Sequence, residues 1–353
     1  MLRRVSQFGL GTTGLANCLI GRRPMLARAL LILCYHRVVP MDEPDEFPFD
    51  SDLVSATPVD FAWQMQFLRR HFTPISVETL LAAIAGERPL PPRSVLVTFD
   101  DGYDDCFHYA LPILKSEGMP GCVFVSSGLI GSEDTFWFDQ LAYAVLATET
   151  PRLELPEIGI VAELPTGRPA RRKLYARIVA ALKRVPDPLR VELVERTKRQ
   201  CRVTPDRDLR GLSRPMSASH VMEASRSGLS VQSHTVSHPI LSNVDADRLR
   251  AELMESRVAI GELTGIAPDV LAYPNGTWND FGQREVDAAR ACGYRAAVTY
   301  ESGFQMADSL DPFRLLRLPV NWRHSRSWFR TMLAVPEVAS GSRAPVEVAD
   351  ATG

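Results

Sequence analysis

The stretch that decides the fold is SVLVTFDDG, residues 94–102. An apolar and β-branched segment runs from Ser94 to Phe99 and breaks at Asp100-Asp101-Gly102. A short apolar run that ends in turn residues is typical of a buried strand in a parallel sheet. The two adjacent carboxylates repel each other unless a cation or a proton relieves the repulsion, although all three residues also favour ordinary turns. The segment therefore predicts a buried strand and leaves the role of its aspartates open.

Strands of this kind alternate with helical patterns along most of the chain. Two of the helical patterns end at a glycine, Gly118 and Gly265, which is a typical C-terminal signal. Such alternation predicts a parallel sheet wrapped by helices, and polar motifs at strand ends should share one face of a barrel of the TIM type. The predicted fold class is α/β, a distorted (β/α) barrel with strands at residues 31–35, 94–99, 122–125, 229–232, 270–273 and 295–299.

The predicted barrel occupies residues 31–330, and its rhythm is broken from about 133 to 215. That break contains one apolar helical pattern and an arginine-rich segment, so we expect a helical insertion over one rim of the barrel. Residues 1–30 are a mildly apolar, arginine-flanked segment, either a helix packed on the surface or a weak membrane-surface helix. Residues 331–353 are small, polar and aperiodic, so we expect a flexible tail.

The composition narrows the class of protein. Hydrophobic residues make up 45% and charged residues 23%, as in an ordinary soluble globular protein. Forty basic against 42 acidic residues leave a net charge of -2, which argues against a nucleic-acid partner. The six cysteines form no CxxC pair, which argues against a cysteine zinc site and favours a reducing compartment. No convincing signal-peptide core is visible, so we expect a cytoplasmic protein, with peripheral attachment to the inner membrane surface as the alternative.

A second polar motif, HTVSH, follows another apolar strand at residues 234–238. Histidines four residues apart can converge on one helical turn and bind a divalent metal through their neutral ring nitrogens. A carboxylate from another strand end would complete a set of two histidines and one carboxylate. Single histidines are usually structural, but this pair beside an Asp-Asp strand end favours a metal site.

A third motif is LAYPNG at residues 271–276, where a strand ends in a Pro-Asn-Gly turn. The motif can be an ordinary β-turn. Its functional interpretation is that the turn presents a backbone N–H to a developing oxyanion.

In this order, TFDDG, HTVSH and the proline turn resemble the polysaccharide deacetylase family with the NodB-homology domain, which is carbohydrate esterase family 4-like. The resemblance runs from about residue 31 to 322, and the pairing of the first two motifs makes it specific. It implies a barrel of the NodB-homology type and one divalent metal ion, zinc first, with cobalt or nickel as alternatives. By this resemblance Asp100 is the general base, Asp101, His234 and His238 are the metal ligands, and the Tyr273 backbone N–H helps to hold the oxyanion.

Two positions depart from the family pattern. Many members carry an arginine that orients the catalytic base at the position of Ala272, and a Leu-x-His motif that supplies the general acid. Here the matching C-terminal region, residues 315–319, has no histidine. His36, at the end of the first predicted strand, resembles the acid of the permuted branch that includes bacterial poly-N-acetylglucosamine deacetylases. We therefore predict His36 as the acid, with His324 as the alternative.

The resemblance implies a hydrolase acting on carbon–nitrogen bonds other than peptide bonds. It would remove N-acetyl groups from a polysaccharide or glycan intermediate, with Asp100 as base and a metal-bound water attacking the amide. Three rivals stay open: hydrolysis of another non-peptide C–N bond, a catalytically silent glycan-binding domain, and a paired-carboxylate glycosidase, which adjacent aspartates make unfavourable. The sequence leaves the sugar, its chain length, the metal, the role of the insertion and the oligomeric state undetermined.

Overall fold

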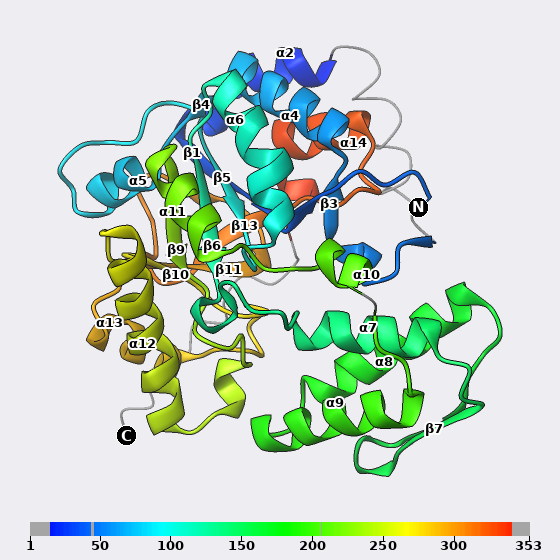
Figure 1. Ribbon diagram of the computed structural model, residues 1–353. Helices are drawn as coiled ribbons and strands as arrows, with labels where there is room; N and C mark the ends of the chain where they lie inside the picture. Colours follow the sequence, from blue (N-terminus) through cyan, green and yellow to red (C-terminus); the bar gives the residue numbers. More distant parts are fainter. Residues whose placement is uncertain (1–14, 44–45, 206, 341–353) are drawn as a thin grey trace, which may run out of the picture.

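The computed structural model describes residues 15–43, 46–205 and 207–340 (Figure 1). At its centre lies a closed barrel of parallel strands. β1 pairs with both β13 and β5, and these two pairings close the ring. The predicted (β/α) barrel is confirmed, and its seven strands in chain order are β1 (Ala29–Tyr35), β5 (Ser94–Phe99), β6 (Gly121–Val125), β9 (Leu229–Ser233), β10 (Val270–Ala272), β11 (Ala296–Ser302) and β13 (Leu315–Pro319).

The barrel strands are apolar because both of their faces are covered. Every residue of β1, β5, β6 and β10 is buried, with side chains alternating between the barrel interior and the surrounding helices. Short strands extend the sheet at its edges: β4 (Thr73–Pro74) beside β5, and β12 (Gln305–Met306) antiparallel to β1. A separate parallel pair, β2 (Arg37–Val38) and β3 (Val54–Ala56), follows β1.

The surrounding helices begin at polar N-cap side chains. Thr57, Ser76, Ser217, Asp245 and Ser325 each accept a hydrogen bond from a backbone N–H of the first turn. The helices are α4 (Pro58–His71), α5 (Val77–Ile84), α6 (Leu111–Glu117), α11 (Ala218–Arg226), α12 (Ala246–Thr264), α13 (Gln283–Ala291) and α14 (Arg326–Ala334), with a π-helical turn at Cys106–Ala110 and 3-10 turns at Ser51–Leu53, Ser127–Leu129 and Leu241–Asn243.

The expected insertion lies between β6 and β9 and forms a separate helical layer beside the barrel (Figure 1). Its helices pack on an apolar core of their own, built around residues such as Leu141, Ile178 and Leu193. A β-hairpin that the sequence did not predict joins two of them. The elements are α7 (Trp137–Ala147), β7 (Arg152–Leu155), a 3-10 turn at Pro156–Ile158, β8 (Ile160–Glu163), α8 (Arg168–Leu182), α9 (Asp187–Cys201) and α10 (Arg207–Leu212).

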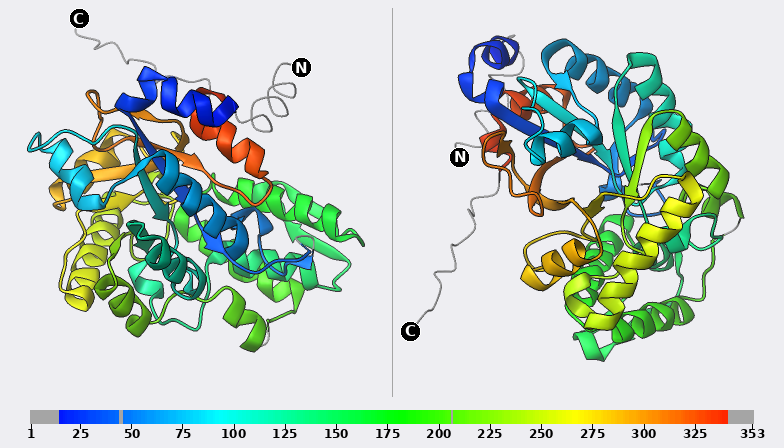
Figure 2. Two further views of the ribbon diagram at one scale, coloured as in Figure 1. Left: turned by 90° about the horizontal axis from the view of Figure 1, so that it is seen from above. Right: turned by 90° about the vertical axis from the view of Figure 1, so that its left-hand side faces the viewer.

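The two ends of the described chain pack together on one side of the barrel (Figure 2). The N-terminal helices α2 (Leu15–Arg22) and α3 (Pro24–Arg28) lie there, with Ile20 buried, and Arg23 pairs with Glu337 at 2.6 Å.

The expectation of a flexible tail from residue 331 is corrected: residues 331–334 complete α14, and a 3-10 turn follows at Pro336–Val338. The reason is an apolar helix face that includes Met332 and packs into the core. The rest of the expected tail, residues 341–353, lies outside the described residues, as does the N-terminal segment before residue 15.

No helix among the described residues is both long enough and apolar enough to cross a membrane. Cys34, Cys106, Cys122, Cys201 and Cys292 are free thiols, and all but Cys292 are buried. The four buried thiols agree with the expectation of reduced core cysteines, and Cys292 is only partly buried.

Candidate active site

The two aspartates stand where β5 ends. The Asp100 N–H donates to the Tyr35 carbonyl at 2.9 Å, so the β1–β5 ladder runs on by one residue. The chain then turns through left-handed conformations at Asp101 (φ 71°) and Gly102 (φ 73°). A Cβ at Gly102 would come within 2.7 Å of a Val125 methyl, so only glycine fits this turn. Both carboxyl side chains are buried, with 3% of each aspartate exposed.

The two histidines converge on Asp101, as the sequence predicted, but through a loop rather than a helical turn. Thr235 (φ 69°) and His238 (φ 56°) adopt left-handed conformations that bend the chain back. His234 Nε2 lies 3.5 Å and His238 Nε2 3.4 Å from Asp101 Oδ1. The other ring nitrogen of His234 bonds to the Ala272 carbonyl at 2.8 Å, an outer contact that fixes which nitrogen faces the carboxylate.

Glu252 of α12 holds this histidine loop in place. Its carboxylate accepts the backbone N–H groups of Val236 at 2.8 Å and Ser237 at 2.9 Å, and the Ser237 hydroxyl at 2.6 Å. Glu252 is 1% exposed, so these bonds are shielded from water. Sequence reasoning missed this residue, because nothing in the pattern of α12 distinguishes it from a surface glutamate.

The Asp101, His234 and His238 side chains fit a divalent cation. Their three ligand atoms lie within 4.8 Å of one another. Ligands placed tetrahedrally at zinc distances stand about 3.3 Å apart, close to the separations seen here. Asp101 Oδ2 and His238 Nδ1 are buried and have no hydrogen-bond partner in the described part of the chain, and a cation would relieve the unpaired carboxylate oxygen. Burial and the neighbouring His234 lower the pKa of His238 to about 3, so its ring stays neutral, the form that binds metal.

A second group of one aspartate and two histidines is less suited to bind a divalent cation. Asp104, His108 and His220 also lie within 4.8 Å of one another on the barrel's outer side. However, Asp104 is already satisfied by the Arg214 guanidinium at 2.6 Å and by His220 at 2.5 Å. Among the described residues Asp101 forms no ion pair with an arginine or lysine and faces only the two imidazoles, so the first group is the better candidate for the metal.

The partner of Asp100 is Arg317 of β13, which the sequence did not reveal. The guanidinium, fully buried, donates to Asp100 Oδ1 at 2.7 Å and to Oδ2 at 2.6 Å. Burial alone would raise the pKa of Asp100, but the charge and hydrogen bonds of Arg317 hold it well below its usual range. Arg317 therefore stands in for the arginine missing at position 272, and Asp100, with both oxygens occupied, is less suited than Asp101 to bind metal.

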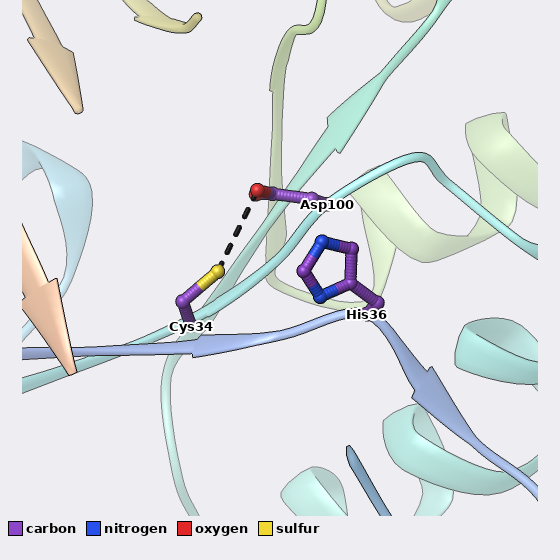
Figure 3. Close-up of side chains that lie close together, drawn as sticks. All are labelled: Cys34, His36 and Asp100. Carbon is purple, nitrogen blue, oxygen red and sulfur yellow. Dashed lines mark hydrogen bonds between the residues drawn. The ribbon is translucent and has the colours of Figure 1, made fainter. Parts of the chain in front are cut away.

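His36 lies beside Asp100 at the end of β1 (Figure 3). A ring nitrogen of His36, the Cys34 sulfur and an Asp100 oxygen lie within 4.8 Å of one another. The Cys34 thiol donates to Asp100 Oδ2 at 3.5 Å, and the His36 ring packs edge-on against Tyr300, with centroids 5.5 Å apart. His324, the alternative acid, packs near Trp328 and does not line the pocket that contains the aspartates.

Tyr273 is not placed for the role predicted from the motif. Its backbone N–H donates to the Val298 carbonyl at 3.2 Å and so continues the β10–β11 ladder, while its ring stacks on Phe281. Asn275, two residues on, lines the pocket instead, with a left-handed φ of 56°. Its side-chain amide nitrogen is buried without a partner, and its backbone N–H has no acceptor among the described residues.

These groups line one cavity of about 250 Å³ at the C-terminal ends of the strands. Barrel residues form its floor, and the insertion supplies part of its wall. Tyr175, Val179 and Lys183 come from α8 or its C-cap, and Phe138 of α7 packs against the His238 ring with centroids 5.5 Å apart. The insertion therefore forms part of the site.

The comparisons agree with this architecture. The family model described as polysaccharide deacetylase matches residues 87–297. The poly-beta-1,6-N-acetyl-D-glucosamine N-deacetylase of Escherichia coli (strain K12) is 32% identical over 103 residues, which are 29% of this chain and 14% of that protein. The chain thus matches about one seventh of that relative's length.

Two solved structures share the fold. The deacetylase PplD of Streptococcus pyogenes, solved in complex with acetate, is 18% identical, with a TM-score of 0.57 over 86% of this chain and 98% of that one. IcaB from Ammonifex degensii is also 18% identical, with a TM-score of 0.55 over 87% of this chain and 97% of that one.

Fold and site together define a parallel barrel with an Asp-His-His group suited to a metal ion and a second, arginine-paired aspartate beside it. The chain belongs to the polysaccharide deacetylase family.

His238→Ala should abolish metal binding. The variant removes one of three ligands, so we expect affinity to fall by more than the about 10- to 100-fold that outer-shell partners cost. Metal content by mass spectrometry and zinc titration of the purified chain measure this. His108→Ala, in the second cluster, is the matched control and should keep one metal per chain. Equal metal content in wild type and His238→Ala would contradict the assignment.

Proposed function

We propose that this chain is a metal-dependent hydrolase that removes N-acetyl groups from an N-acetylated saccharide. The observation that carries the proposal is the division of roles between two adjacent buried aspartates. Arg317 occupies both oxygens of Asp100, whereas Asp101 faces two imidazoles and keeps an unpaired oxygen. Membership of the polysaccharide deacetylase family supports the same reaction, and the named activity of the Escherichia coli relative suggests N-acetylglucosamine as the sugar.

Asp101, His234 and His238 would hold the cation. Zinc suits two nitrogens and one carboxylate oxygen, and cobalt and nickel are the alternatives. When bound, a divalent cation of this kind polarises an acyl oxygen and lowers the pKa of water.

Asp100 is the proposed proton acceptor. The Arg317 pair keeps it ionised and fixes its orientation, so it is ready to take a proton from the attacking water. Asp100 directly precedes the proposed ligand Asp101 in the chain, so the proposed base lies beside the proposed metal group.

Asp100→Asn should lower turnover by about 10²–10⁴, because the proton acceptor is lost while a side chain of the same shape remains. Acetate release and metal content are measured on the same preparation, and metal should stay bound. Asp101→Asn is the comparison and should lose metal. Should Asp100→Asn lose metal to the same degree, the roles of the two aspartates are reversed.

His36 is the proposed general acid. The leaving sugar amine must be protonated, and His36 lies next to Asp100 in the same pocket. The Tyr300 ring, which packs against the His36 ring, and the Ser55 hydroxyl, which accepts the His36 backbone N–H at 2.9 Å, position it.

His36→Ala should cut acetate release from an N-acetyl sugar by about 10²–10⁴ with metal content unchanged. On 4-nitrophenyl acetate, whose phenolate leaves without a proton, the same variant should lose little activity, whereas Asp100→Asn should lose activity on both substrates. His324→Ala serves as the control. An equal loss of His36→Ala on both substrates would exclude the acid role and indicate a structural one.

Asn275 replaces Tyr273 as the proposed oxyanion donor. Asn275 lines the pocket, and among the described residues neither its side-chain amide nitrogen nor its backbone N–H has an acceptor. These donors would stabilise the negative charge that develops on the acetyl oxygen.

Asn275→Gly should lower kcat by about 10²–10³, the usual cost of one oxyanion donor. Glycine keeps the left-handed backbone and its N–H, so the change isolates the side-chain amide. Kinetics on an N-acetyl sugar, with thermal unfolding as the check on folding, measure it. If Asn275→Gly keeps the wild-type kcat, the Asn275 side chain is not an oxyanion donor.

The silent-domain alternative rested on Ala272 and the missing C-terminal histidine. Arg317 pairs with Asp100 and His36 lies beside it, so these two residues would take the roles of the missing groups, which argues against a silent domain. Hydrolysis of another C–N bond would use the same residues, and an amide panel would separate the two. A cytoplasmic location, peripheral to the inner membrane at most, remains a prediction from the sequence.

A further inference from the structure

Lys183 stands in the active-site pocket without a counter-ion. It follows the last residue of α8 and lines the same cavity as Asp100, Asp101 and His36. Within the described part of the chain, no carboxylate lies within ion-pair distance of its ammonium group. Its main-chain carbonyl accepts the Asn243 side-chain amide at 2.9 Å, so the barrel fixes the end of α8 at this place.

Three carboxylates, those of Asp50, Asp280 and Asp101, act electrostatically on the Lys183 ammonium group, but each is bound to other groups. Asp50 accepts the Tyr175 hydroxyl at 3.0 Å. Asp280 accepts the Thr277 backbone N–H and hydroxyl at 3.0 and 2.6 Å, and Asp101 faces the two imidazoles. Burial lowers the pKa of Lys183, because an ammonium loses hydration in the pocket, and these three carboxylates only partly oppose that effect.

Among the described residues that line the pocket, Lys183 is the one lysine or arginine, and each lining carboxylate is engaged by another group. Arg317 pairs with Asp100, and Arg323 pairs with Asp52. Asp101 faces the two imidazoles. An ammonium group that is partly desolvated and has no carboxylate in contact is stabilised when an anionic ligand pairs with it.

The size of the pocket limits where the pairing group can lie. Its volume of about 250 Å³ is slightly below the range of about 300–1,000 Å³ typical of small-molecule sites, so it suits one sugar ring rather than a run of polymer. An anionic group on the acetylated sugar itself, or on its immediate substituent, would lie in the same pocket as Lys183.

We propose that the substrate is an N-acetylated sugar carrying an anionic group, a phosphate or a carboxylate, and that Lys183 binds this group. The proposal rests on the proposed deacetylase function and names its substrate class. Lys183 is a specificity residue here: it holds the sugar in place and takes no part in the bond that breaks.

Acetate release from three probes tests the proposal on the metal-loaded full chain. The probes are N-acetylglucosamine 1-phosphate, N-acetylmuramic acid with its carboxylate, and the neutral methyl N-acetylglucosaminide. We expect kcat/KM to favour at least one anionic probe by about 10- to 100-fold, the range of a charge-assisted contact. The phosphate and carboxylate probes distinguish the two sources of charge.

Variants of Lys183 give the second half of the test. Lys183→Met should lower kcat/KM for the anionic probe far more than for the neutral probe, while Lys183→Arg should keep most of the preference. Lys173→Met, an exposed lysine on the same helix, is the matched control. Equal rates on anionic and neutral probes in wild type, or a preference that survives Lys183→Met, would overturn the proposal.

Binding separates this proposal from the deacetylase function. If no probe releases acetate, the proposed function fails, and calorimetric binding of N-acetylglucosamine 1-phosphate and of the neutral glycoside then decides the anion question without turnover. Tighter binding of the phosphate that Lys183→Met abolishes supports the Lys183 site, and equal binding excludes it.

Discussion

Asp100 and Asp101 are neighbours in the chain and both are buried, so their charges must be separated by what each side chain faces. A buried carboxylate without a partner is costly, and two adjacent ones repel each other as well. The bidentate Arg317 pair stabilises one of them inside the barrel. The other faces His234 and His238 with an oxygen left unpaired, which a cation would satisfy. The chemistry proposed for the site follows from this asymmetry, because an ionised, oriented base and a metal group need different surroundings.

Barrel closure makes this arrangement available. β1 pairs with β5 on one side and with β13 on the other, so Asp100 at the end of β5 and Arg317 within β13 both face the same interior. The same closure places β1 between β5 and β13, and His36, which directly follows β1, lies beside Asp100. An open sheet with the same strand sequence would separate these groups to opposite edges.

The strained loops around the site show where the fold departs from regular structure. Among the described residues, four of the six non-glycine residues with left-handed φ values, Asp101, Thr235, His238 and Asn275, belong to the metal group, its loop or the proposed oxyanion turn. Such conformations persist when surrounding contacts hold them, as Glu252 does for the histidine loop. The insertion adds side chains of α7 and of α8 with its C-cap to the wall of the pocket, so a segment outside the barrel contributes to the site.

The sequence by itself determined the barrel, the strand that carries the aspartates and the convergence of Asp101, His234 and His238. Those features follow from local patterns: apolar runs fix the strands, and motifs at parallel strand ends must meet on one face. The sequence assigned the oxyanion turn to the wrong residue, because only the ladder from Tyr273 to Val298 shows that its N–H is taken. Arg317 lies 217 residues from Asp100, and no local pattern around it indicates that the two side chains pair. Lys183 lies in an arginine-rich segment, and nothing in the sequence distinguishes it from the solvent-exposed charges there. Only the tertiary structure shows which groups are available for the proposed roles, because a buried ion pair, an amide without a partner and a lysine without a contacting carboxylate depend on neighbours that are distant in the linear chain.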